Sequence, residues 1–224
     1  MRVAALASAL ALLLAGICRV GLAQEARQEV LRSGFADMSP AIQAMQRDDA
    51  ANPAWLWLED GRQRFAAACA RCHTVDAMAG VAARYPAWDE ALRRPLTLGQ
   101  RIAACHARAG ASAAPPLTPD SDARLALETF VAQQSRGRAI APPADVRLAL
   151  WRERGRMLFE QRLGQLDLAC KHCHDQAAGR RLAGSVIPQG HATGYPIYRL
   201  EWQGMGSLQQ IGRASCRERV CMLV

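Results

Sequence analysis

The sequence predicts a mainly α-helical chain with two helical domains in tandem, which are related by duplication and of which the second is truncated. Three observations support this fold class. The pattern Leu-Trp-x-Glu-x-Gly-Arg-x-x-Phe occurs at 56–65 and again at 150–159, and such self-similarity indicates a duplicated unit. Apolar residues recur at helical spacing in several segments, and no segment alternates strongly enough to predict a strand. Half of the 224 residues are hydrophobic, so one or two modest domains can bury a core.

Residues 1–23 are interpreted as a secretory signal peptide. A basic residue precedes an apolar run over 3–17, and the small residues at 21–23 suit a cleavage site. The run is too short for a membrane-spanning helix and has the wrong flanks. Cys18 would suit a lipid anchor, but Ile17 occupies a position that needs a small residue. No other stretch is long and apolar enough to span a membrane, so the sequence predicts a periplasmic protein with no membrane span.

The first domain is predicted over 56–140, after an N-terminal extension at 24–55. The repeated pattern opens this domain as a helix, with Trp57 and Phe65 on its apolar face. That face must be buried against another element. The best partner is a second amphipathic helix over Ala123–Gln134.

Capping residues mark the starts of two helices in this domain. Thr97 and Gln100 are placed as a capping box ahead of a helix near Leu98–Arg108, and Asp122 can cap the helix that follows it. A Pro-rich stretch at 138–144 then predicts a linker to the second domain. This second, incomplete domain is predicted over residues 141–210.

Each copy of the repeated pattern leads into the motif Cys-x-x-Cys-His. This motif attaches haem, because its two thiols form thioether bonds to the porphyrin and its histidine binds the iron. A disulfide, a redox Cys-x-x-Cys and a zinc site are alternatives, but two motifs behind the same helix and after a signal peptide favour haem. The sequence thus predicts two cytochrome c-type domains with two covalently bound haems c, anchored by Cys69, Cys72, Cys170 and Cys173 and with His73 and His174 as axial iron ligands.

The motif does not fix the sixth ligand of either iron. Cys105 is the odd cysteine of the first domain, and a thiolate ligand would lower the potential of its haem. A free cysteine is also a common buried and inert residue, so both interpretations stay open at this point. The rival ligands are Met78, His106 and Met157 for the first haem and His191 and Met205 for the second.

The formal net charge of +8 does not indicate a nucleic-acid-binding protein. Half of this charge lies in the leader and in residues 211–224, and the haem propionates would offset most of the rest. No basic run is interleaved with aromatic residues, so there is no case for nucleic acid. A mild attraction to anions or acidic partners stays open.

Residues 211–224 are interpreted as a non-native tail. The stretch Ile-Gly-Arg-Ala-Ser-Cys-Arg-Glu-Arg-Val at 211–220 resembles one reading frame of a sequencing adapter. Processing and assembly scars are excluded from fold reasoning. Cys216 and Cys221 therefore carry no weight in the prediction.

Several segments outside the haem motifs are not generic features of haem proteins. The most specific is Gly-Tyr-Pro-Ile-Tyr-Arg-Leu-Glu-Trp-Gln at 194–203, followed by Gly-Ser-Leu at 206–208. The others lie at 80–86, 101–105 and 134–137. With these segments and both motifs, the chain from Ser39 to Gln210 resembles the SoxA family, the dihaem subunits of the SoxAX cytochromes of bacterial thiosulfate oxidation.

The resemblance implies an L-cysteine S-thiosulfotransferase, which uses haem c to join thiosulfate oxidatively to a cysteine of the carrier protein SoxYZ. Electrons would pass through haem to SoxX, a monohaem cytochrome c that forms a heterodimer with the family's subunits, and then to a small cytochrome c. The resemblance also implies that Cys105 is the distal thiolate ligand of the first haem.

The family further implies a catalytic cysteine, modified as a persulfide, as the distal ligand of the second haem. It is expected just after Gln210, on an arginine-rich segment. Cys216 lies near that position, but its neighbours match the adapter rather than the family. The chain as written is therefore expected to be inactive, and a full-length protein is expected to be active.

Three alternative functions stay open at this point. A dihaem c-type electron-transfer protein without substrate chemistry would need Met or His at both distal positions. An enzyme that couples two thiosulfates to tetrathionate is disfavoured by the stretch at 194–203. A haem-based scaffold would only position a partner protein.

Overall fold

The computed structural model of the chain describes residues 31–109, 116–191 and 193–210. From Ser33 onward the described residues belong to one compact unit. The predicted signal peptide at 1–23 and the predicted tail at 211–224, with Cys216, lie outside the described residues. The division of the compact unit into two domains near residue 140 stays a prediction.

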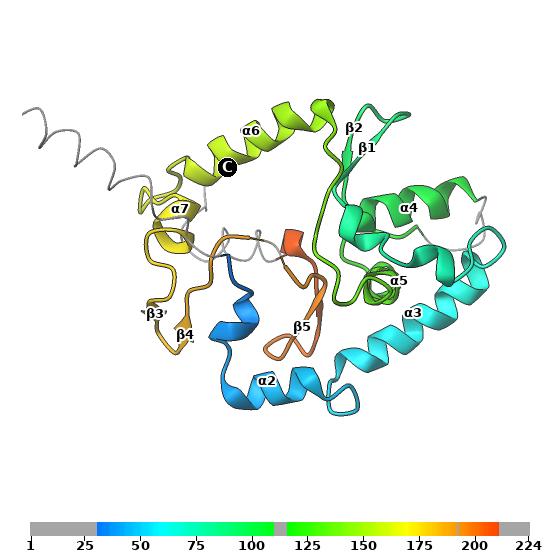
Figure 1. The fold of residues 1–224 in the computed structure, drawn as a ribbon, viewed down its shortest axis with the longest axis horizontal. Coiled ribbons are helices and arrows are strands. Elements are labelled where there is room, and N and C mark those ends of the chain that lie inside the picture. Colours follow the sequence, from blue (N-terminus) through cyan, green and yellow to red (C-terminus); the bar gives the residue numbers. More distant parts are fainter. Residues whose placement is uncertain (1–30, 110–115, 192, 211–224) are drawn as a thin grey trace, which may run out of the picture. The chain divides into compact units, whose positions relative to one another are not determined.

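Helices make up most of the regular structure, which confirms the mainly α-helical class (Figure 1). The α-helices and 3-10 helices (η) are η1 Gly34–Asp37, α2 Pro40–Arg47, α3 Ala54–Ala68, η2 Asp76–Met78, η3 Ala82–Arg84, α4 Leu98–Arg108, α5 Asp122–Gln133, η4 Val146–Leu148, α6 Ala149–Glu160 and α7 Cys170–His174. Within the described part of the chain, none of them is both long and apolar enough to cross a membrane.

Short strands form two-stranded antiparallel sheets between the helices. They are β1 Ala87–Asp89 with β2 Arg94–Leu96, β3 Arg181–Leu182 with β4 Ser185–Val186, and β5 Ile197–Arg199 with β6 Gly204–Gly206. The sequence analysis did not predict them. Strands of two or three residues are too short for an alternating apolar pattern to be recognised.

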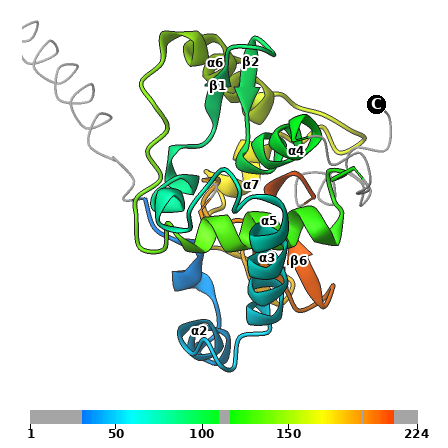
Figure 2. The same ribbon diagram turned by 90° about the vertical axis from the view of Figure 1, so that its right-hand side faces the viewer.

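The core of the first half forms where α5 lies across α3 (Figure 2), and this confirms the predicted pairing of the two helices. Phe65 of α3 is 3% exposed and packs against Phe130 of α5, with the ring centroids 5.2 Å apart. Gly61 permits the close approach, because a Cβ atom there would overlap the backbone carbonyl of Ala126 and lie 2.8 Å from the Phe130 Cβ. The buried cluster is completed by Leu98, Leu127 and Val131.

The start of α4 confirms the predicted capping box. The Thr97 hydroxyl accepts from the Gln100 backbone N–H at 3.3 Å, and the Gln100 side chain accepts from the Thr97 N–H at 2.9 Å. The predicted cap of α5 was wrong by one residue. Ser121 has an extended backbone, and its hydroxyl accepts from the N–H of Arg124 at 3.4 Å, whereas Asp122 is the first helical residue.

The hairpins β1–β2 and β5–β6 correspond to each other in several respects. Both pair three-residue strands in the same antiparallel register, and both follow a cis Tyr-Pro peptide bond. Both have a non-glycine residue with positive φ just before the second strand and a hydroxyl–glutamine capping pair just after it. These residues are Arg93 (φ 52°) and Gln203 (φ 48°), Thr97 with Gln100, and Ser207 with Gln210.

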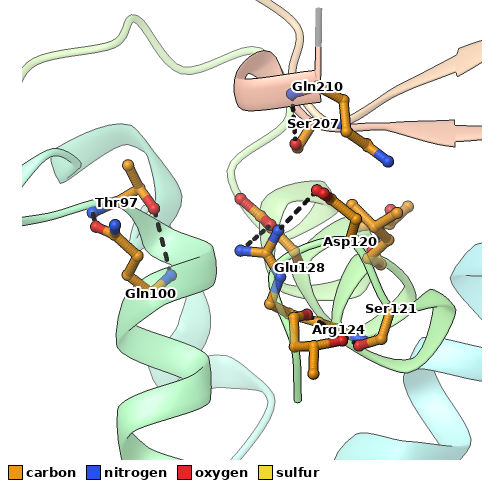
Figure 3. A network of polar contacts seen from close by, with 11 residues as sticks. Thr97, Gln100, Asp120, Ser121, Arg124, Glu128, Ser207 and Gln210 are labelled. Atoms are coloured by element: carbon orange, nitrogen blue, oxygen red, sulfur yellow. Dashed lines mark hydrogen bonds and ion pairs between the residues drawn. The ribbon is translucent and has the colours of Figure 1, made fainter. Parts of the chain in front are cut away.

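An ionic cluster around the buried Arg124 lies beside the second capping pair (Figure 3). Arg124 of α5 is 2% exposed, and its guanidinium lies 3.9 Å from carboxylate oxygens of both Asp120 and Glu128. Burial raises the pKa of Glu128, although the positive charge of Arg124 opposes this shift. The cluster lies where α5 contacts the β6 region. This contact joins the first half of the compact unit to the second half.

The second copy of the repeated pattern has different surroundings from the first. The helix α6 has no buried residue, whereas α3 buries Gly61 and Phe65. A Cβ atom added at Gly155, the counterpart of Gly61 in the pattern, would meet no atom within 4 Å. In the described residues, α6 therefore lacks a partner helix comparable to α5.

Candidate haem sites

The first Cys-x-x-Cys-His motif forms a tight turn at the end of α3. The N–H of Cys69 donates to the Phe65 carbonyl at 2.8 Å and so closes the last helical turn. The N–H groups of Cys72 and His73 both donate to the Cys69 carbonyl at 3.0 Å. Both thiols and the imidazole therefore project from one short piece of fixed backbone.

The structure brings Cys105 of α4 to this turn. The pKa of the Cys69 thiol is raised chiefly by burial, and then by the nearby Cys105 and Cys72 sulfurs. Cys69 and Cys105 are both half-buried, while Cys72 is exposed. This interaction of the two half-buried sulfurs shows that the odd cysteine lies in the neighbourhood of the first motif.

An arginine contacts the sulfur of Cys105 directly. Arg108 lies one turn further along α4, and its Nη2 is 3.5 Å from the Cys105 Sγ. The guanidinium is an obligatory donor, so the sulfur accepts this contact. Sequence reasoning missed Arg108, although the spacing of three residues on a predicted helix was a usable signal.

The segment that carries Cys105 is fixed to the β1–β2 hairpin by an ion pair. Asp89 is 3% exposed, and its carboxylate accepts from the Leu92 N–H at 2.7 Å and pairs with Arg101. Tyr85 also forms a hydrogen bond with Arg101. The Leu92 hydrogen bond and the Arg101 charge hold the pKa of Asp89 below its usual value. These contacts link the 80–86 and 101–105 segments of the sequence analysis.

The rival distal ligands have varied surroundings. Met78 ends η2 and packs against the core, and His106 is half-buried next to Cys105 on α4. Met157 is 56% exposed on α6. Met205 is 4% exposed in β6, and His191 is half-buried in the segment after the second motif. Cys105 interacts electrostatically with Cys69 of the first motif, and Met78 packs against the same core cluster as Cys69.

The second motif forms the one-turn helix α7, in which its two histidines differ in role. The Nδ1 of His172 accepts from the Ala169 N–H at 3.0 Å and so caps the start of α7. The Nδ1 of His174 lies 2.9 Å from the carbonyl oxygen of Pro188. A carbonyl can only accept, so Nδ1 carries the proton and Nε2 keeps the lone pair that binds a metal.

Packing around His174 is close. A Cβ atom at Gly190 would lie 2.7 Å from the Phe159 ring and 3.1 Å from the His174 Cβ. Phe159 is the last residue of the repeated pattern, and Gly190 lies close to both Phe159 and His174. Sequence reasoning missed both Pro188 and Gly190, which follow the motif in a stretch without helical or strand periodicity.

The donor set of each motif fits a haem c. The five cysteines of the described residues are free thiols, and each motif offers two of them with a histidine in the adjacent position. Within the described part of the chain, no cluster of three or more His, Cys, Asp and Glu side chains could hold a bare metal ion. A haem iron needs fewer protein donors than a bare ion, since the porphyrin ring supplies four of its ligands.

Comparisons with known proteins identify the family to which the chain belongs. Residues 55–140, which hold α3, the first motif, α4 and α5, match the family model of the SoxA/TsdA cytochrome c domain. The SoxA subunit of an L-cysteine S-thiosulfotransferase from Pseudaminobacter salicylatoxidans is 31% identical over 196 residues, which cover 83% of this chain and 68% of that protein. The chain belongs to the SoxA family.

Two further comparisons agree with membership of the SoxA family. The SoxA subunit of the same enzyme from Rhodovulum sulfidophilum is 31% identical over 202 residues, which cover 86% of this chain and 69% of that protein. The crystal structure of SoxXA from P. pantotrophus matches with a TM-score of 0.75 and 28% identity, over 81% of this chain and 71% of that chain.

Membership of the SoxA family confirms the predicted family and enzyme class. It also confirms the cytochrome c-type fold, which implies haem c as the cofactor. The comparisons do not count the haems or assign ligands, so the two-haem set with Cys105 stays a prediction.

Proposed function

We propose that the chain is the SoxA-type subunit of a thiosulfate-conjugating enzyme. This subunit uses haem c in joining thiosulfate to a cysteine of the SoxYZ carrier. The observation that carries this proposal is the match to SoxA subunits over 83% and 86% of the chain. The structure supports it with the orientation of His174 by Pro188 and with the approach of Cys105 to Cys69.

Two covalently bound haems c are proposed, one at each motif. Cys69 and Cys72 would anchor the first, with His73 as its proximal ligand and Cys105 as its distal ligand. Cys170 and Cys173 would anchor the second, with His174 as its proximal ligand. The distal ligand of the second haem is not assigned, and the family's catalytic cysteine is expected just after Gln210, beyond the described residues.

The two halves are proposed to be a tandem duplication with an incomplete second copy. The matching registers of β1–β2 and β5–β6 support the duplication. The contrast between Gly61, which meets α5, and Gly155, which meets open space in the described part of the chain, supports an incomplete second domain. The domain at 56–140 would thus have its helical partner, and the domain at 141–210 would lack one.

The proposed reaction forms one sulfur–sulfur bond. The sulfur of the carrier cysteine bonds to the terminal sulfur of thiosulfate, the thiol proton goes to solvent, and two electrons are released. Bound haem supplies the electron acceptors, from which SoxX and then a small cytochrome c are reduced. Exposed arginines of the chain can hold the thiosulfate dianion and acidic partner surfaces.

The proposed partners and compartment follow from the family and the leader. The structural relative is a SoxXA complex, which supports a SoxX-type monohaem cytochrome as the heterodimer partner. The SoxYZ carrier and a small cytochrome c are the other proposed partners. The leader at 1–23 supports export to the periplasm, where thioether attachment of haem takes place.

The test is thiosulfate-dependent conjugation, read as the mass added to the SoxYZ carrier peptide, with SoxX and an oxidised small cytochrome c present. A protein with the family's own residues after Gln210 is expected to conjugate thiosulfate, and the 224-residue chain is expected not to. No conjugation by the first protein would contradict the proposed function. Robust conjugation by the second would contradict only the interpretation of 211–224.

The alternative of a plain dihaem electron carrier makes a different prediction. It requires Met or His at both distal positions, so its first haem would lack a thiolate signal in the electron paramagnetic resonance (EPR) spectrum. The match to SoxA subunits favours the SoxA-type assignment. A low-spin thiolate signal that disappears in Cys105→Met would reject the electron-carrier alternative.

A further inference from the structure

The last turn of α4 holds a side-chain contact that the proposed function does not use. Arg108 Nη2 lies 3.5 Å from the Sγ of Cys105, three residues earlier on the same helix face. Arg108 is exposed and Cys105 is half-buried. The charge of Arg108 also reaches Asp89, which is itself paired with Arg101.

We propose that Arg108 raises the reduction potential of the first haem by donating a hydrogen bond to the Cys105 sulfur. The proposal rests on the proposed ligation of iron by Cys105. A thiolate donates charge to iron and favours the ferric state. A charged N–H donor on the sulfur withdraws part of that charge, as hydrogen bonds to ligating sulfur do in metal sites.

The positive charge of Arg108 acts in the same direction as the hydrogen bond. Ferric haem carries one more positive charge than ferrous haem, so a nearby cation disfavours the oxidised state. Removal of Arg108 therefore lowers the potential through both effects. Arg108 is a tuning residue in this account, since it acts on the iron through the sulfur of Cys105.

A purely structural role for Arg108 is the competing explanation. The residue ends α4, where a cation interacts favourably with the unpaired carbonyl groups of the helix terminus. That role changes the stability of the helix and leaves the haem potential unchanged. A lysine at 108 keeps the positive charge at the helix end but lacks the planar fork of the guanidinium. Arg108→Lys therefore distinguishes stabilisation of the helix end from an effect on the haem potential.

The experiment uses the haem-loaded protein and spectroelectrochemical titration of both haems in wild type, Arg108→Gln and Arg108→Lys. At a fixed potential near the midpoint, Arg108→Gln is expected to shift the ferric-to-ferrous ratio of the first haem about tenfold toward ferric, or about 59 mV for one electron. Arg108→Lys is expected to give a smaller fall in the reduction potential of the first haem. The second haem is the internal reference and is expected to keep its potential.

Arg64→Gln is the matched control, because it removes one exposed positive charge from α3, where Arg64 pairs with Asp60. It is expected to leave both potentials unchanged, since the Arg64 guanidinium contacts a carboxylate and not a sulfur proposed to bind iron. An unchanged first potential in Arg108→Gln, with the thiolate EPR signal intact, would overturn the role of Arg108. A wild-type protein without that signal would overturn Cys105 ligation, and the tuning role with it.

Discussion

The Nδ1 atom of His174 lies 2.9 Å from the carbonyl oxygen of Pro188, a residue that follows the second motif in the chain. This contact gives the imidazole a fixed tautomer and orientation before any metal binds. For His73, the structure records no hydrogen bond of the side chain among the described residues. The second motif is therefore the better preorganised of the two on its proximal side.

Gly190→Ala tests the packing that supports His174. The new Cβ atom would lie 2.7 Å from the Phe159 ring and 3.1 Å from the His174 Cβ. Phe159 is half-buried and can shift, so we expect a loss of stability of roughly 1 kcal/mol, at the low end of the range for overpacking. The EPR signal of the second ferric haem is expected to shift as the imidazole turns.

Gly184→Ala is the control for this substitution, because a Cβ atom there meets nothing within 4 Å. It is expected to leave both the melting temperature and the EPR spectrum unchanged. An equal effect of the two substitutions would show that Gly190 does not position His174.

The repeated pattern allows a matched pair of substitutions at its glycine. Gly61→Ala places a methyl group against the backbone of Ala126, which cannot move without separating α3 from α5. We expect a loss of about 3 kcal/mol, measured by urea unfolding. Gly155→Ala meets open space and is expected to stabilise α6 by about 0.5–1 kcal/mol, because alanine is the better helix former.

The two alanine substitutions are expected to change the free energy of unfolding in opposite directions. If Gly155→Ala destabilises the 224-residue chain as much as Gly61→Ala does, then α6 has a close helical partner, and the proposal of an incomplete second domain is wrong.

Asp89→Asn tests the ion pair that fixes the Cys105 segment. The Leu92 N–H bond and the Arg101 charge lower the pKa of Asp89 in the folded state. The stability from its charged form is therefore complete above the usual Asp pKa of about 3.9, and it is lost as the pH falls through the lowered folded-state value. We expect Asp89→Asn to melt below wild type at pH 6 and the two melting curves to converge in acid.

Asp60→Asn is the control for this pH series. Asp60 forms an exposed pair with Arg64 on α3, and exposed pairs contribute little to stability. A constant gap in melting temperature between wild type and Asp89→Asn from neutral pH down to acid would contradict the role of the Asp89 carboxylate.

Local signals explain which elements could be predicted from the sequence. The helix at Leu98–Arg108 was predicted with its correct bounds, because Thr97 and Gln100 satisfy its first backbone groups without help from the rest of the fold. The start of α5 was missed by one residue, since Ser121 and Asp122 are both good caps and only the backbone geometry selects between them.

Other features depend on tertiary structure and left no readable pattern. The hairpins turn at Arg93 and Gln203, which adopt positive φ without being glycine or asparagine, so the usual turn signals are missing. The approach of Cys105 to Cys69 results from the packing of α3, α4 and α5. The contact of His174 with Pro188 depends on the path of the chain after the second motif.

The most direct test of the account is the intact mass of the protein after expression with the haem-attachment machinery. The account predicts the polypeptide plus two haems, and one haem in each of the variants Cys69→Ala/Cys72→Ala and Cys170→Ala/Cys173→Ala. A wild-type mass equal to the bare polypeptide would contradict haem attachment at these two motifs. So would a double variant that carries as many haems as the wild type.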